Sequence, residues 1–273
     1  MNRDGPIAIA GADGHLGRWL AGRLGELGIQ ARPLPREGDP LPELAGCRAV
    51  VHLAGTLAPA GPNTFEQANV ETVRRTVEAV RADGSARRIV FVSYVGADPN
   101  SKNAYLRTKG QAEELVRGSG LPFTILRCPL VIGEPSRPGP TTGAFLARDS
   151  GPIRAIGDGR QLVAPIFAGD VVAMIVSAAT GEGPEGTFEL GGPETMPLDD
   201  LIHIVNHPDI SIRYTPVLLA AFIALFSKRI TPALVGVMGS DSVPEGDPVA
   251  AAALFGAKLT PIDSVWPQVP LGG

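Results

Sequence analysis

The sequence predicts an α/β fold in which a doubly wound parallel sheet is followed by a small C-terminal α/β lobe. Short apolar runs alternate with helical patterns through residues 1–133, the order that builds a parallel sheet from strand–helix–strand units. A glycine-rich turn joins the first strand to the first helix, and most of the 26 prolines follow residue 121. We therefore expect residues 134–273 to supply the remaining sheet elements and the lobe, within one continuous globule.

The first elements follow one another closely. Residues 6–10 form an apolar run that ends at a glycine, which predicts a buried strand. Leucines at intervals of four, four and three predict a helix over 16–27, which Gly28 ends in a left-handed conformation. Residues 29–34 predict the second strand.

The pattern repeats along the rest of the first half. A third strand is expected at 49–53, and valines at helical spacing predict a helix over 70–80. The β-branched and aromatic run 89–92 predicts another strand, followed by a charged helix over 105–117 and a strand at 123–126. These alternations predict parallel pairing.

The second half is less regular. Residues 134–143, rich in proline, glycine, serine and threonine, predict a loop. Strands are expected at 162–167 and 187–190, and a helix over 170–179 that Asp170 opens as its N-cap. Beyond them, short helical segments alternate with prolines.

Composition excludes several classes of protein. The formal net charge of −4 offers no basic face for nucleic acid. Two cysteines, Cys47 and Cys128, cannot build a disulfide framework and fit a reducing cytoplasm, with each as a small core residue. No secretory signal opens the sequence. His203 and His207 are spaced for one helix face, but Pro208 follows at once and no third ligand is evident, so we expect no metal site.

The segment 216–229 stands apart. It begins with an apolar run of eleven residues, 216–226, whereas a membrane span needs about 20. Lys228 and Arg229 follow the run. The segment is either an interfacial helix that contacts a membrane or a membrane complex, or a helix packed into the protein as a lid or core element.

The turn after the first strand has the spacing Gly-x-x-Gly-x-x-Gly. A chain that turns sharply from strand into helix, without Cβ atoms in the way, can present backbone N–H groups and the positive helix end to a pyrophosphate. A tight turn without a ligand is the alternative, but the position between a strand and an amphipathic helix favours a dinucleotide. The expected contacts here are Gly11, Asp13, Gly14, His15, Leu16 and Gly17.

Cofactor choice depends on the end of the second strand, where an acid binds a ribose 2′-hydroxyl and an arginine accommodates a 2′-phosphate. Arg36 lies 19 residues after Gly17 and favours NADP. Glu37, whose carboxylate could serve NAD, follows it, and Arg36 and Arg32 could also be solvated surface charges.

Tyr105 and Lys109 are four residues apart, on one face of the predicted helix. The reference pKa of a phenol is near 10. An adjacent ammonium would lower the pKa of Tyr105 and let it act as a general acid or base. Such pairs are common on helices as exposed side chains, but here the pair follows a glycine loop and a strand that ends in Ser93.

The motifs occur in a specific order. After the glycine loop come His52-Leu53-Ala54-Gly55, Asn69-Val70-Glu71-Thr72, Val92-Ser93, Tyr105-x-x-x-Lys109 and Leu126-Arg127-Cys128-Pro129. Together they resemble the extended and atypical short-chain dehydrogenase/reductase superfamily, with its NAD-dependent epimerase/dehydratase-like proteins. The stretches 95–101, 191–194 and 255–257 are similar to the branch related to the complex I accessory subunit that holds NADPH.

The resemblance implies a Rossmann core, Tyr105 as catalytic acid or base, Lys109 as its electrostatic partner and a serine, Ser93, that holds the substrate oxygen. Two positions depart from the family pattern: the usual catalytic hydroxyl falls at Tyr94 or Val95, and Asp13 replaces a threonine or serine. Further cofactor contacts implied by the family are Leu53, Ala54, Gly55, Asn69, Cys128, Pro129 and Leu130.

We therefore expect an NADP-dependent oxidoreductase, or an epimerase/dehydratase-like enzyme, that acts on a carbonyl or hydroxyl group of a small molecule. Hydride would pass to or from the nicotinamide. Because members of this branch also hold a nucleotide without clear turnover, the alternative is a non-catalytic NAD(P)H-binding scaffold or redox-sensing subunit that docks on a partner complex. Specificity is expected in residues 134–160 and the C-terminal lobe, which do not identify the substrate.

Overall fold

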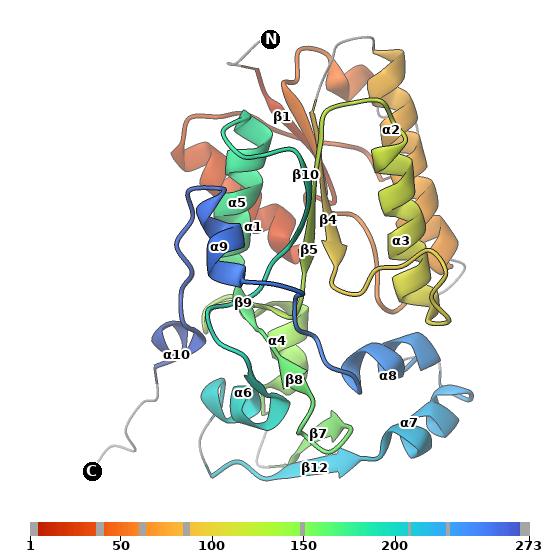
Figure 1. Cartoon of the computed structure of the whole chain (residues 1–273), viewed down its shortest axis with the longest axis vertical. Coiled ribbons are helices and arrows are strands. Elements are labelled where there is room, and N and C mark those ends of the chain that lie inside the picture. The colour runs from red at the N-terminus through yellow and green to blue at the C-terminus, as the bar shows by residue number, and fades with distance from the viewer. Residues whose placement is uncertain are drawn as a thin grey trace.

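The computed structural model describes residues 5–36, 41–59, 64–83, 88–147, 151–206, 209–227 and 230–267. A six-stranded sheet with the order β10-β5-β4-β3-β1-β2 forms its upper part (Figure 1). Every neighbouring pair in this sheet is parallel. Its strands are β1 (Ile7–Ala10), β2 (Ala31–Pro33), β3 (Ala49–His52), β4 (Arg88–Tyr94), β5 (Phe123–Cys128) and β10 (Gly186–Glu189).

Helices cover both faces of the sheet, which confirms the doubly wound prediction. α1 (His15–Glu26) and α5 (Ala168–Thr180) lie on one face, and α2 (Thr72–Ala82) and α3 (Ala104–Arg117) on the other (Figure 1). The strand order reverses between β1 and β3. In such sheets ligands bind in the crevice outside the carboxyl ends of the strands at this point.

The alternation of side chains along β1 explains the two layers. Ile7 and Ile9 are fully buried in the cluster that contains Leu20 of α1. Ala8, between them, belongs to the opposite cluster with Val80 of α2. Because successive strand residues point to opposite faces, a strand buried on both sides is apolar throughout.

Two predictions for the second half are wrong in detail. Part of the expected loop 134–143 is helical, because α4 (Gly139–Phe145) starts there with a proline in its first turn, where the missing N–H costs nothing. The expected strand 162–167 is two short strands, β8 (Leu162–Val163) and β9 (Ile166–Phe167). They belong to different sheets, β8 pairing with β11 (Met196–Pro197) and β9 with β6 (Val131–Ile132).

Asp170 is also not the N-cap of its helix. Phe167 holds that position, and Asp170 lies in the first turn, where its charge still favours the positive helix end. Its carboxylate accepts hydrogen bonds from the backbone N–H and the Oγ1 of Thr260, at 2.7 and 2.9 Å. Asp170 therefore ties the C-terminal segment to α5.

The lobe below the sheet contains β7 (Ile153–Ile156) paired with β12 (Ile212–Thr215), and several short helices. The helices begin at a proline or directly after one, as the alternation in the sequence predicts. In the lobe they are α6 (Leu198–Ile204), α7 (Val217–Ala224), α8 (Pro232–Met238) and α10 (Ile262–Val265), whereas α9 (Pro248–Ala253) lies beside α5 at the main sheet (Figure 1).

The described ranges hold neither a membrane-spanning helix nor a cluster of metal ligands. No helix there combines the length and apolarity needed to cross a bilayer. No group of three metal-ligating side chains occurs in the same ranges. His207, one member of the histidine pair set aside above, lies outside the described residues.

Candidate functional site

The glycine loop folds tightly against its surroundings. Gly11 has φ +86°, and a Cβ on it would lie 2.8 Å from the backbone nitrogen of Ala54. A Cβ on Gly17 would lie 2.2 Å from the carbonyl oxygen of Gly11. The third glycine thus permits close contact between α1 and the loop itself. Only glycine fits either position without displacing backbone.

Two adjoining cavities of about 560 and 640 Å³ lie along the carboxyl ends of β1, β3 and β4. They share the walls formed by the glycine loop and the segment after β3, so together they form one extended cleft. Every site residue predicted from the sequence lines one or both of them. The first contains Asp13 and Arg36; the second contains His15, Leu16, Gly17, Asn69, Ser93, Tyr105, Lys109, Cys128, Pro129 and Leu130; both contain Gly11, Gly14, Leu53, Ala54 and Gly55.

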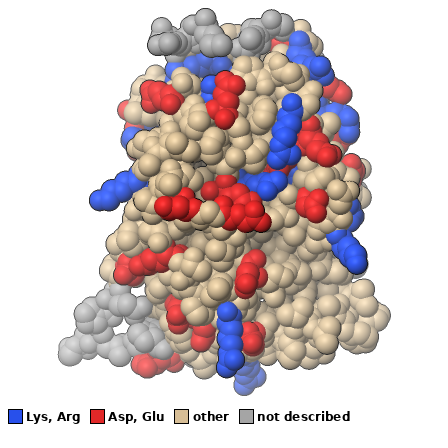
Figure 2. Space-filling model, viewed as in Figure 1, with Lys and Arg blue, Asp and Glu red and all other residues tan. Residues whose placement is uncertain are grey.

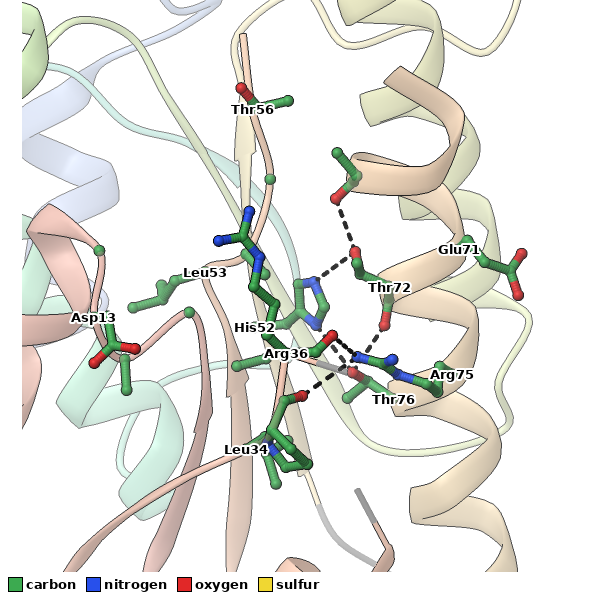
Figure 3. Close-up of a pocket in the computed structure, with 18 of the residues that line it drawn as sticks. Asp13, Leu34, Arg36, His52, Leu53, Thr56, Glu71, Thr72, Arg75 and Thr76 are labelled. Atoms are coloured by element: carbon green, nitrogen blue, oxygen red, sulfur yellow. Dashed lines mark hydrogen bonds between the residues drawn. The ribbon is translucent and has the colours of Figure 1, made fainter. Parts of the chain in front are cut away.

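The first cavity has a basic end (Figure 3). Arg36 lines it, and Arg75 reaches across from α2. The Arg75 guanidinium donates to the carbonyls of Pro35 and Arg36, at 3.3 and 2.7 Å. Arg32 instead donates to backbone carbonyls outside the cavity. Arg75 thus fixes the segment that carries Arg36; the sequence did not indicate this, because the two arginines are 39 residues apart.

A neutral polar group borders the same cavity. His52 is buried, and its Nδ1 lies 3.1 Å from Oγ1 of Thr76. Burial, together with the smaller effect of the Lys109 ammonium, lowers the pKa of His52 to about 3. His52 is therefore uncharged at neutral pH, and its hydrogen bond with Thr76 connects β3 to α2.

The second cavity brings together Ser93, Tyr105 and Lys109. Ser93 is buried, and its Oγ has no hydrogen-bond partner among the residues that the structure describes. Such an orphaned hydroxyl in a cavity wall is available to a ligand. Tyr94, one alternative for the catalytic hydroxyl, instead forms a hydrogen bond with Oγ of Ser242 at 2.9 Å. The hydroxyl of Tyr94 thus ties the end of β4 to the segment that contains Ser242.

Lys109 is bonded to the backbone of β4, the strand beside α3. Its Nζ donates to the carbonyl of Val92 at 2.7 Å and lies 4.2 Å from the centroid of the Phe91 ring. Burial lowers the pKa of Lys109 to about 8. Burial also raises the pKa of Tyr105, with Tyr94 and Cys128 adding to the rise, so desolvation outweighs any effect of the ammonium.

Asn69 clamps the loop after β3 to α3. It lies in a π-helical turn, η2 (Glu66–Glu71), that precedes α2, and such turns are frequent at functional sites. Its Oδ1 accepts from the N–H of Thr56 at 2.8 Å. Its Nδ2 donates to the Thr56 carbonyl and to Oγ1 of Thr108, each at 3.1 Å. Asn69 therefore shapes the cavity through bonds within the protein.

The far wall of the second cavity is apolar and was not indicated by the sequence. Leu234, Val237 and Met238 come from α8, and Pro140 and Ala144 from α4. Each of these helices has only seven residues and lies in a proline-rich region, so no periodic pattern in the sequence identified them as part of a site. Cys128 also lines this cavity. Burial raises the pKa of its thiol to about 12, so the thiol stays protonated.

These features fit a dinucleotide: a glycine cradle that a Cβ would fill, a basic end, and an orphaned hydroxyl at the other end. Fold and cleft together define the class, an NAD(P)-binding protein built on the Rossmann fold. A family model described as NAD(P)H-binding matches residues 39–154. The chain belongs to this NAD(P)H-binding family.

Named relatives include both subunits and enzymes. The chain is 28% identical to NADH dehydrogenase (ubiquinone) 1 alpha subcomplex subunit 9, mitochondrial, of Arabidopsis thaliana, over 72% of this chain and 56% of the relative. It is 30% identical to a (4-alkanoyl-5-oxo-2,5-dihydrofuran-3-yl)methyl phosphate reductase of Streptomyces griseus subsp. griseus, over 70% of this chain and 69% of the relative. Against several curated relatives the chain spans only 37% to 60% of their length.

A solved structure shows the same fold. MoeE5 in complex with UDP-glucuronic acid and NAD superposes with a TM-score of 0.71 over 97% of both chains, at 20% identity. At this identity the likeness concerns the fold alone.

Proposed function

We propose that the protein is an NADP-dependent oxidoreductase that reduces a carbonyl group of a small molecule, with Tyr105 as the proton donor. The observation that carries this proposal is the second cavity, where the orphaned Ser93 hydroxyl, Tyr105 and Lys109 line one space. Relatives named as reductases support the same class of reaction.

The chemistry divides between cofactor and chain. A bound nicotinamide supplies the hydride that reaches the carbonyl carbon. Ser93 Oγ donates a hydrogen bond to the carbonyl oxygen and holds it in place, and the Tyr105 phenol gives that oxygen its proton. The Lys109 ammonium stabilises the phenolate left behind, which then regains a proton from solvent. Because burial raises the pKa of Tyr105, the phenol is protonated at neutral pH, which favours proton donation and hence reduction.

Replacement of Tyr105 tests the mechanism. Tyr105→Phe should abolish NADPH oxidation in the presence of a panel of aldehydes and ketones, because the proton donor is lost. The dissociation constant for NADPH should stay nearly unchanged, since the phenol makes no hydrogen bond to the residues that the structure describes. A Tyr105→Phe variant that retains full turnover would contradict the mechanism.

NADP preference rests on Arg36. We propose that its guanidinium, on the segment that Arg75 holds in place, pairs with the 2′-phosphate. A lost charge-assisted hydrogen bond costs about 1.5–3 kcal/mol, so Arg36→Ala should weaken NADPH binding at least about tenfold and NADH binding little. Arg32→Ala is the matched control, because this partly buried arginine lies outside the cavity. Tighter binding of NADH than NADPH by the unaltered protein would refute the preference.

A second function is favoured by one relative and one surface. The Arabidopsis relative is named as a subunit of NADH dehydrogenase, and α7 presents a large apolar surface to solvent. The protein would then hold NADPH as a scaffold or redox-sensing subunit. Tightly bound NADPH that copurifies with the protein, and neither exchanges nor oxidises with added carbonyl compounds, would favour this function.

A further inference from the structure

The helix α7 is apolar on every side, but its small and large residues are segregated. Ala220 and Ala224, 5% and 4% exposed, pack against Val235 of α8. Partly buried Ile156, Ala221 and Ile230 also pack against this cluster. The short side chains therefore face the protein, which leaves the large ones to face outward.

The outward residues form what we call the α7 apolar face. Leu218 is 86% exposed, Phe226 77%, Leu225 68% and Phe222 61%. The face consists of Leu218, Leu219, Phe222, Ile223, Leu225 and Phe226. The corner of the molecule that α7 occupies at lower right in Figure 1 is uncharged in the same view in Figure 2. Soluble proteins rarely expose so many large apolar residues together, so this face marks a contact site.

Charge is distributed unevenly around this face. Residues 210–240 contain no aspartate or glutamate, although the chain as a whole has a formal net charge of −4. The basic residues of this stretch are Arg213, Lys228 and Arg229. Arg213 is exposed on β12, which leads directly into α7, and is the register partner of exposed Arg154 on β7. Along the sequence, basic residues therefore flank the apolar helix on both sides.

We propose that α7 docks the protein on the surface of an anionic lipid bilayer. The α7 apolar face would lie among the acyl chains, with the neighbouring basic residues at the headgroups, the arrangement of interfacial helices. The helix has eight residues, about 12 Å, and cannot span a hydrocarbon core of about 30 Å. This proposal stands independently of the redox function.

A second copy of the chain fits the same face less well. In a two-fold dimer the same patch meets itself, so the basic residues of both copies would gather around one interface. Like charges at an interface oppose association, whereas anionic headgroups neutralise them. Docking on a bilayer would also bring α8, which lines the apolar wall of the second cavity, close to the lipid.

Vesicle flotation with the full-length protein tests the proposal. We expect the protein to float with vesicles of phosphatidylglycerol and phosphatidylcholine, and far less with phosphatidylcholine alone. Leu218→Ser combined with Phe222→Ser should lower the partition coefficient roughly a hundredfold, because two large apolar side chains no longer enter the lipid. Leu254→Ser is the matched control, since this leucine is 56% exposed just after α9. Unchanged NADPH affinity would show that both variants fold.

Three results would overturn the proposal. The first is failure of the unaltered protein to float with the anionic vesicles. The second is equal flotation of the double variant and the unaltered protein. The third is a concentration-dependent dimer in size-exclusion chromatography that the double variant abolishes, when neither protein binds vesicles. That result would assign the α7 apolar face to a second copy.

Discussion

Gly17 and Gly22 lie on the same helix, and the structure predicts opposite effects when each is replaced by alanine. At Gly17 the new Cβ would be 2.2 Å from the carbonyl oxygen of Gly11 and 2.5 Å from that of Ala12. At Gly22 no atom lies within 4 Å of the new Cβ. The pair therefore separates close packing of the loop from the general preference of a helix for alanine.

The magnitudes follow from these distances. Carbon and oxygen without a covalent bond stay about 3.3 Å apart, so the loop carbonyls must move by about 1 Å in Gly17→Ala. Overpacking of this kind costs about 1–3 kcal/mol. Gly22→Ala should instead stabilise the protein by about 0.5–1 kcal/mol, because alanine loses less entropy on folding. We expect the two variants to differ by about 1.5–4 kcal/mol in the free energy of unfolding.

Two measurements check this prediction. Urea denaturation should give a lower midpoint for Gly17→Ala and a higher midpoint for Gly22→Ala than for the unaltered protein. Titration with NADPH should show at least about tenfold weaker binding by Gly17→Ala, because displaced backbone N–H groups lose a hydrogen bond to phosphate. If Gly17→Ala matched Gly22→Ala in both stability and affinity, the proposed phosphate loop would be refuted.

Three further predictions concern buried polar groups. Burial lowers the pKa of Lys109 from 10.5 to about 8, so the unfolded chain binds more protons between these values and stability rises with pH. Urea denaturation should show a rise of about 2 kcal/mol from roughly pH 7 to pH 9.5 that Lys109→Met lacks. Glu113 accepts two hydrogen bonds from Arg127, at 2.7 and 2.9 Å, and is fully buried. Glu113→Gln should cost about 3 kcal/mol, and an unchanged urea midpoint would contradict this. Asp170→Ala should cost about 2 kcal/mol and speed limited proteolysis near Thr260, since two hydrogen bonds to that residue are lost.

Local patterns in the sequence predicted the nucleotide side of the molecule well. The glycine spacing and the leucines of α1 depend on neighbours a few residues away, so they can be recognised without the fold. The same holds for Tyr105 and Lys109, one turn apart on α3. Prediction failed where local patterns were interrupted, as at α4, which follows a proline-rich stretch, and at β8 and β9, which a proline separates.

The sequence by itself indicated the succession of strands and helices through residues 1–133, the position of the glycine loop and the cleft residues that these elements carry. These follow from apolar periodicity and from the conformational freedom of glycine. Only the tertiary structure decided the roles within that set. It buried Ser93 without a partner, directed Lys109 toward the Val92 carbonyl and brought Arg75 to the backbone of Arg36. It also turned the small side of α7 inward. These outcomes depend on desolvation and on contacts between distant segments, which no local pattern encodes.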